Sequence, residues 1–123
     1  MSRQTLIAVI DDDDSFRRAL VESLLSFGFD VRDFASAEDF LASGDVSTYG
    51  CVVSDIHLAG MNGIDLKYAL AARRIQIPVI MITARSDPGL EDKVAASGAL
   101  CLLKKPFETE ALLQCLEEGL DAG

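Results

Sequence analysis

Short apolar runs rich in valine and isoleucine alternate along the chain with segments of helical spacing, and this alternation limits the fold more than any other feature. Such runs are typical of buried strands, and a helix between two of them carries the chain back to begin a parallel neighbour. The sequence therefore predicts an α/β fold with a doubly wound, five-stranded parallel sheet covered on both faces. The predicted strands are residues 5–10, 30–34, 51–55, 79–83 and 99–103.

Between the predicted strands, apolar residues recur every three or four positions, as they do on the buried face of a helix. Ser36 is a predicted N-cap, and Gly28, Gly44 and Gly98 are predicted to end three of the helices. The last helix is predicted over residues 108–120. The residues predicted to form the buried helix faces are Phe16, Leu20, Leu24, Phe27, Leu66, Ala69, Leu70, Leu90, Val94, Ala95, Leu112, Leu116 and Leu120.

Polar side chains follow the predicted strands, at the ends where doubly wound sheets bind their ligands. They are Asp11 and Asp12 after the first strand, Asp55 and Thr83 at the ends of the third and fourth, and Lys105 after the fifth. Carboxylates that converge there repel by about 1 kcal/mol per pair at about 4 Å in water, and by about 4 kcal/mol at an effective dielectric constant of about 20. A cation is therefore expected beside them, and hard oxygen ligands favour Mg²⁺ or Mn²⁺ over zinc.

A carboxylate beside such a cation, with a lysine and a hydroxyl nearby, has the groups needed to accept a phosphoryl group. The carboxylate is the nucleophile, and the neighbouring groups neutralise charge and donate to the phosphoryl oxygens. Asp13 and Asp14 complete the acidic run and are expected to face solvent in the first turn of the next helix, where the helix dipole favours negative charge. The alternative for the whole run is a solvated acidic turn that caps that helix.

The composition excludes several other functions. A net charge of −9 argues against nucleic-acid binding or anionic-membrane binding by this chain itself. No apolar stretch approaches the roughly 20 residues needed to cross a bilayer, and the N-terminus does not read as a signal peptide, so a cytoplasmic location is predicted. His57 is the only histidine, which leaves no partner for a His/Cys zinc site or for Ser/His/Asp catalysis. The length predicts one domain over residues 1–123.

Four motifs in order along the chain carry a family resemblance that covers nearly its whole length. They are IDDDDSFRRAL at 10–20, CVVSDIHLAGMNGIDL at 51–66, VIMITA at 79–84 and LLKKPF at 102–107. With these motifs the chain resembles the CheY-like receiver domain of response regulators, the phosphoacceptor half of bacterial two-component signalling. The segments SAEDFLA and KKPFE are similar to the FixJ-like branch. The resemblance implies a flavodoxin-like (βα)5 fold with strand order 2-1-3-4-5.

The resemblance also implies an acceptor and a metal site. Asp55 would take a phosphoryl group from a histidine kinase, a phosphotransfer protein or a small phosphodonor. Asp12, Asp55 and the backbone carbonyl of His57 would bind Mg²⁺ or Mn²⁺, with Asp11 acting through water. Such a domain is a signalling module that catalyses only its own phosphorylation and dephosphorylation.

Further residues are implied to hold and sense the phosphoryl group. Lys105 would pair with a phosphoryl oxygen and precede a cis bond to Pro106. Thr83 would move its hydroxyl onto the phosphoryl group, aided by the backbone N–H groups of Ile56 and Ala84. The signal is then expected to leave through the surface of the fourth helix, the fifth strand and the last helix, which is also the surface expected to form a homodimer.

Two positions depart from the family pattern. Ala59 stands where a proline is usual after the phosphoacceptor, which is expected to loosen one turn without removing a functional group. Leu102 stands three residues before Lys105, where tyrosine, phenylalanine or histidine is common. The second departure calls into question the usual coupling between Thr83 and a rotating aromatic ring.

Two other functions are compatible with the sequence. Asp11, Asp13 and Ser15 match the DxDx(T/S) signature of haloacid-dehalogenase-like phosphatases, in which Asp11 would be the nucleophile. That class requires a further acidic motif behind a late strand, whereas the acidic residues after Lys105 lie on the predicted last helix. A phosphorylation-independent interaction domain that keeps the acidic site as a relic is the second alternative.

Overall fold

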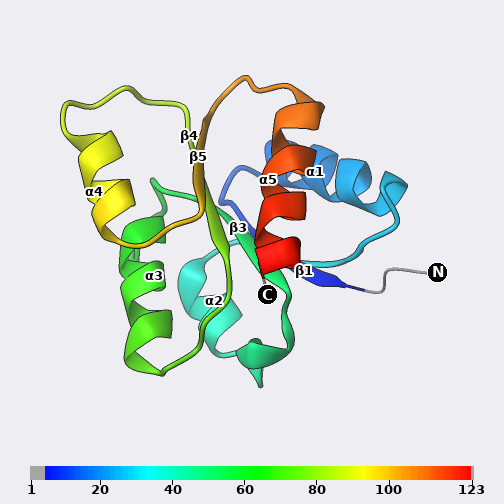
Figure 1. Cartoon of the computed structure of the whole chain (residues 1–123), viewed down its shortest axis with the longest axis horizontal. Coiled ribbons are helices and arrows are strands. Elements are labelled where there is room, and N and C mark those ends of the chain that lie inside the picture. Colours follow the sequence, from blue (N-terminus) through cyan, green and yellow to red (C-terminus); the bar gives the residue numbers. More distant parts are fainter. Residues whose placement is uncertain (1–4, 123) are drawn as a thin grey trace.

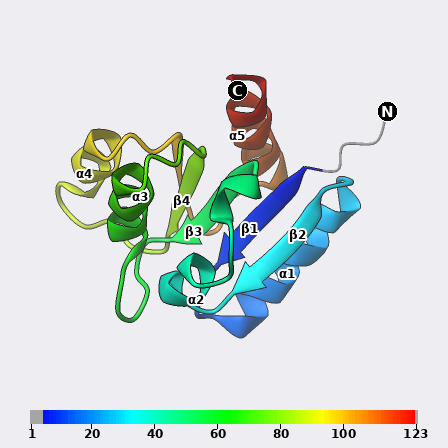
Figure 2. The ribbon, with the colours of Figure 1, turned by 90° about the horizontal axis from the view of Figure 1, so that it is seen from below.

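Five parallel strands form one central sheet in the computed structural model, which describes residues 5–122. They are β1 Leu6–Ile10, β2 Asp30–Phe34, β3 Cys51–Asp55, β4 Val79–Thr83 and β5 Cys101–Lys104. The order across the sheet is β2-β1-β3-β4-β5, so the direction of winding reverses at β1, which pairs with both β2 and β3. The predicted fold class and strand order are confirmed. Figure 1 shows the whole chain, and Figure 2 shows β2, β1, β3 and β4 in this order across the sheet.

Helices cover both faces of the sheet. They are α1 Asp14–Ser26, α2 Ala37–Leu41, α3 Gly63–Ala72, α4 Leu90–Ala96 and α5 Thr109–Ala122, with a short 3-10 helix at Val46–Thr48. Figure 2 shows α1 and α5 on one side of the sheet and α2, α3 and α4 on the other. A right-handed crossover places its helix on the face that its direction across the sheet requires. The step from β1 to β2 runs one way and the later steps to β3, β4 and β5 run the other, so α1 lies on one face and α2, α3 and α4 lie on the other.

Local sequence signals mark several helix ends, and the cap predicted at Ser36 and the stop predicted at Gly28 are confirmed. Asp13 caps α1 by accepting the N–H of Phe16 at 3.1 Å, and Ser36 caps α2 by accepting the N–H of Asp39 at 3.0 Å. Gly28 stops α1 because it takes φ +93°, a left-handed conformation that favours glycine. These caps leave Asp13 and Asp14 exposed in the first turn, as predicted.

Two apolar layers hold the helices on the sheet, because side chains of each strand point alternately to opposite faces. Ala8 and Ile10 of β1 face the layer under α2, α3 and α4, whereas Ile7 and Val9 face the layer under α1 and α5. β3 and β4 are buried along their whole length. Their carboxyl ends are therefore held by rigid packing on both sides.

Several predicted details are wrong. Phe27 is 38% exposed, because α1 has ended at Ser26 and the residue no longer lies on the helix face. Ala95 is exposed, because it lies about 140° around the helix from Leu90, whereas Val94 shares the buried face. α2 ends at Leu41 and not at Gly44, and β5 begins two residues later than predicted, at Cys101.

Candidate functional site

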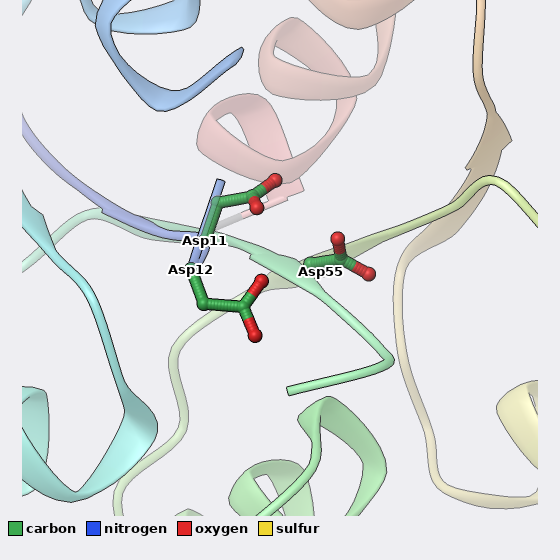
Figure 3. Close-up of side chains that lie close together, drawn as sticks. All are labelled: Asp11, Asp12 and Asp55. Atoms are coloured by element: carbon green, nitrogen blue, oxygen red, sulfur yellow. The ribbon is translucent and has the colours of Figure 1, made fainter. Parts of the chain in front are cut away.

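Three carboxylates meet at the carboxyl edge of the sheet. Asp11 and Asp12 follow β1 directly, and Asp55 is the last residue of the neighbouring strand β3. One carboxylate oxygen from each lies within 4.8 Å of the others. Figure 3 shows the three side chains gathered at these strand ends. The predicted convergence of the three aspartates is confirmed, and it falls where the strand order reverses.

Burial differs sharply among these aspartates. Asp11 is 1% exposed and Asp55 is 8% exposed, whereas Asp12 is open to solvent. Burial raises the pKa of Asp11, and the charge of Asp55 raises it further, against the lowering effect of the Asp13 N–H that donates to Asp11 at 2.9 Å. The ionised form of Asp11 is therefore destabilised at this position, and a nearby cation stabilises it.

Lys105 supplies one positive charge to this cluster. Its Nζ lies 3.2 Å from Asp11 Oδ2 and 3.1 Å from Asp55 Oδ2. Burial lowers the pKa of Lys105, but the hydrogen bond to Asp55 and the charge of Asp11 outweigh burial, so the net direction is upward. The peptide bond from Lys105 to Pro106 is cis, as predicted.

The donor set fits a divalent cation with oxygen ligands. Three ionised carboxylates and one ammonium leave two net negative charges at the cluster, which one Mg²⁺ or Mn²⁺ would balance. All the side-chain donors are hard oxygens, and the exposed Asp12 leaves room for water in the coordination shell.

Thr83 lies at the end of β4 with its side chain fully buried. Its hydroxyl accepts the N–H of Arg85 at 3.0 Å and donates to the Arg85 carbonyl at 3.3 Å. The hydroxyl is thus bound to the backbone of the loop after β4. Ala84, next in the chain, is exposed.

The backbone donor predicted at Ile56 is not free. The N–H of Ile56 donates to the Ile82 carbonyl at 2.9 Å and so extends the β3–β4 ladder by one residue. The next N–H, that of His57, donates instead to Asp55 Oδ1 at 3.0 Å. Successive N–H groups along a strand point to opposite sides, so only one of these two neighbouring N–H groups can point at the Asp55 carboxylate, and the structure shows that it is that of His57.

The His57 side chain connects two loops at the edge of the site. Its Nε2 lies 3.7 Å from Asp87 Oδ2, in the loop after β4, and is buried without a hydrogen-bond partner among residues 5–122. The side chain is 31% exposed. His57 thus lies against the loop that carries Arg85, to which the Thr83 hydroxyl is bound.

Leu102 lies in β5, opposite Met81, and packs half-buried against the layer under α4. It lines a surface groove of about 420 Å³ between α4 and β5. Val94 and Leu100 line the same groove. An aromatic ring at position 102 would therefore meet this groove.

The helical spacing of Phe16 predicts only a place on the buried face of α1, but its ring also contacts the candidate site. Its ring centroid lies 3.9 Å from Lys105 Nζ, and its ring also makes an edge-to-face contact with Phe107 at 6.1 Å. A cation over an aromatic face is attracted by the ring quadrupole. Phe16 therefore supports the ammonium of Lys105 from α1, a contact between positions 89 residues apart that helical spacing does not reveal.

We expect Phe16 and Lys105 to be energetically coupled. In a double-mutant cycle with Phe16→Leu and Lys105→Met, urea unfolding should give a coupling free energy of about 0.5–2 kcal/mol. Phe107→Leu with Lys105→Met is the matched control, because it removes the edge-to-face pair and leaves the ring under the ammonium. Additive effects in the Phe16 cycle would contradict the contact.

The family profile described as "Response regulator receiver domain" matches residues 7–117. The chain belongs to this family of receiver domains of response regulators. It is 35% identical over 120 residues to the transcriptional regulatory protein FixJ of Bradyrhizobium diazoefficiens, covering 98% of this chain and 58% of that protein. It is also 35% identical over 114 residues to the transcriptional regulatory protein TdiR of Thauera aromatica, covering 93% of this chain and 50% of that protein.

Solved structures of response regulators superpose closely on this chain. The structure of the response regulator StyR superposes with a TM-score of 0.88 at 37% identity, covering 98% of this chain and 61% of that chain. The FixJ-N structure has a TM-score of 0.88 at 30% identity, covering 97% of this chain and 95% of that chain. The similarity to the FixJ-like branch predicted from the sequence is confirmed.

The chain spans about half the length of the curated relatives it matches, 50% of TdiR and 58% of FixJ. Within residues 5–122, no helix combines the length and apolar character needed to cross a membrane. The phosphatase alternative is not supported, because Asp13 caps α1 by accepting the Phe16 N–H and the oxygen cluster is formed by Asp11, Asp12 and Asp55.

Proposed function

We propose that this chain is the phosphoacceptor switch of a two-component phosphorelay, with Asp55 as the acceptor. The observation that supports it most is the position of the Asp55 carboxylate, 3.1 Å from the ammonium of Lys105 and within 4.8 Å of the carboxylates of Asp11 and Asp12. The donor would be a histidine kinase, a phosphotransfer protein or a small phosphodonor, as the family membership suggests.

In the proposed reaction, a carboxylate oxygen of Asp55 attacks the phosphorus of the donor. The new oxygen–phosphorus bond forms as the bond to the leaving group breaks, and the leaving group keeps the electron pair. The product is an acyl phosphate on Asp55. Lys105, which already donates to Asp55 Oδ2, would pair with a phosphoryl oxygen.

Asp12, Asp55 and the carbonyl of His57 would hold Mg²⁺ or Mn²⁺, with Asp11 acting through water. The ion would neutralise charge on the phosphoryl oxygens as the bond forms. The backbone N–H of His57, rather than that of Ile56, would donate to the phosphoryl group, because it already points at the Asp55 carboxylate. Ala84 would supply a second N–H.

Thr83 would be the sensor of the phosphoryl group. To reach that group, its hydroxyl has to leave the Arg85 backbone, so phosphorylation would change the conformation of the loop after β4. We propose that the change is passed to the surface of α4, β5 and α5, where an output partner or a second copy of the chain would bind. With a net charge of −9, the domain itself would not contact nucleic acid directly. We place the domain, over residues 1–123, in the cytoplasm with its kinase.

The proposal is tested by mass spectrometry after incubation with acetyl phosphate and Mg²⁺. We expect one added phosphoryl group, and its loss when the metal is removed with a chelator. A chain that binds Mg²⁺ but takes no phosphoryl group from acetyl phosphate or from a cognate kinase would contradict the proposal, and would favour the phosphorylation-independent alternative.

Leu102 is expected to affect how the signal leaves the site and not whether Asp55 is phosphorylated. Leucine has neither a polar tip nor a flat ring with distinct inward and outward positions, so movement of Thr83 would bias the α4–β5–α5 surface through packing alone. A bound phosphoryl group shifts an equilibrium only by its differential stabilisation of the two states. We expect Leu102→Tyr to show a larger change in amide exchange at this surface when beryllofluoride binds.

The control for this prediction is Leu102→Met, which keeps an aliphatic side chain of similar size and should respond like the parent. Binding of Mg²⁺ and beryllofluoride should be the same in all three proteins. An equal or smaller response in Leu102→Tyr would refute the role assigned to position 102.

A further inference from the structure

Glu38 of α2 reaches across to the loop that follows Asp55. Its Oε2 accepts the backbone N–H of Met61 at 2.9 Å, a contact between positions 23 residues apart. The adjacent Gly60 has φ +75°, and a Cβ at this position would overlap Glu38 Oε2. The loop tip is therefore shaped to admit this carboxylate.

The two ends of the same loop are held by the backbone beside Asp55. Ile56 O accepts the N–H groups of Leu58 at 3.1 Å and Gly63 at 3.0 Å. Gly63 packs so closely that a Cβ there would lie 2.7 Å from the Asp55 carbonyl. Between these ends, the bond from Met61 to Glu38 is the only hydrogen bond that holds residues 59–61 within the described part of the chain.

The tip also lacks the proline that is usual in the family at position 59, where this chain has the exposed Ala59. A proline at this position would restrict the backbone of the turn through its own ring, with no hydrogen bond to another element. The hydrogen bond from the Met61 N–H lowers the pKa of Glu38, as expected for a donor that stabilises the ionised carboxylate. The hydrogen bond from the Met61 N–H to Glu38 can therefore restrict the turn, as the ring of a proline at position 59 would.

We propose that Glu38 is a positioning residue for the metal site: by holding Met61, it orders the loop that carries the His57 carbonyl and so raises the affinity for Mg²⁺. This role rests on the proposed function, in which that carbonyl is a metal ligand. Glu38 does not touch the metal. It acts by removing conformations of the loop that would otherwise have to be lost on binding.

Isothermal titration with Mg²⁺ tests the role, and calorimetry suits a chain without tryptophan. We expect Glu38→Ala to lower the affinity roughly three- to tenfold, the range expected from one solvent-exposed hydrogen bond. Glu38→Gln keeps an oxygen acceptor and should stay within about twofold of the parent. Asp39→Ala, which removes a neighbouring exposed carboxylate from the same turn of α2, should also bind like the parent.

Two further measurements separate positioning from general stability. Amide exchange in the metal-free protein should quicken at Met61 and His57 in Glu38→Ala, while the amides of β3 keep their protection. Adding Ala59→Pro to Glu38→Ala should recover most of the lost affinity, because the ring restricts the same turn.

The results distinguish this role from the proposed function itself. A parent that does not bind Mg²⁺ contradicts the proposed function, and the role of Glu38 with it. A parent that binds while Glu38→Ala binds equally well contradicts only the role of Glu38. Equal losses in Glu38→Ala, Glu38→Gln and Asp39→Ala would show that the lost charge, and not the contact with Met61, is responsible.

Discussion

With acetyl phosphate and Mg²⁺, the parent chain should gain one phosphoryl group and Asp55→Asn should gain none. The amide of asparagine has nearly the shape of the carboxylate but is a poor nucleophile and carries no charge. Its single amide oxygen can still accept the N–H of His57, as Asp55 Oδ1 does, and Lys105 keeps its contact with Asp11 although the one with Asp55 Oδ2 is lost, so the fold should persist. Intact-mass measurement of both proteins gives the result directly.

Asp11→Asn is the matched control for this experiment. It removes a second, even more buried carboxylate from the same cluster, so the rate should fall, but the acceptor remains and the adduct should still map to Asp55. An adduct mapped to Asp11 in the parent would contradict the assignment of Asp55 as the phosphoacceptor. It would favour the alternative of a haloacid-dehalogenase-like phosphatase with Asp11 as the nucleophile.

Millimolar Mg²⁺ should raise the melting temperature of the parent by several degrees. The folded state gathers three carboxylates against one lysine, and an ion that binds only the folded state stabilises it by mass action. Free Mg²⁺ at about ten times its Kd stabilises by about 1.4 kcal/mol, which for a domain of this size corresponds to roughly 4–7 °C. Thermal unfolding followed by circular dichroism, with and without the ion, measures the shift.

Asp12→Asn should lose most of this shift, because Asp12 is an exposed member of the oxygen cluster. Asp13→Asn is the matched control. It removes the same charge from the neighbouring position, but asparagine caps a helix as well as aspartate does, so the response to Mg²⁺ should stay close to that of the parent. Equal shifts in both variants, or none in the parent, would contradict a metal site at this cluster.

Much of the candidate site could be predicted from the sequence because its side chains follow strand ends. A parallel sheet brings the carboxyl ends of its strands to one edge, so Asp11, Asp12 and Asp55 had to meet once β1 and β3 were neighbours. Lys105 joins them in the same way from the end of β5. Local alternation and strand order are sufficient for this part of the site.

Other features depended on backbone direction at single residues. Ile56 and His57 are adjacent in sequence, yet one N–H completes the ladder to β4 and the other points at Asp55. Which of them does so depends on where the ladder stops, and composition does not specify that point to one residue. The same limit explains the misplaced ends of α2 and β5.

The sequence by itself determined the order of strands and helices along the chain, the cap at Ser36, and the edge of the sheet where the acidic residues gather. These depend on neighbours a few positions apart, whose spacing can be read along the chain. Only the tertiary structure decided that Asp11 is buried while Asp12 is open, that Phe16 lies under Lys105, and that Glu38 reaches Met61. Each of these depends on how helices lie over the sheet and how far side chains reach between elements, which is set by packing across segments distant in sequence.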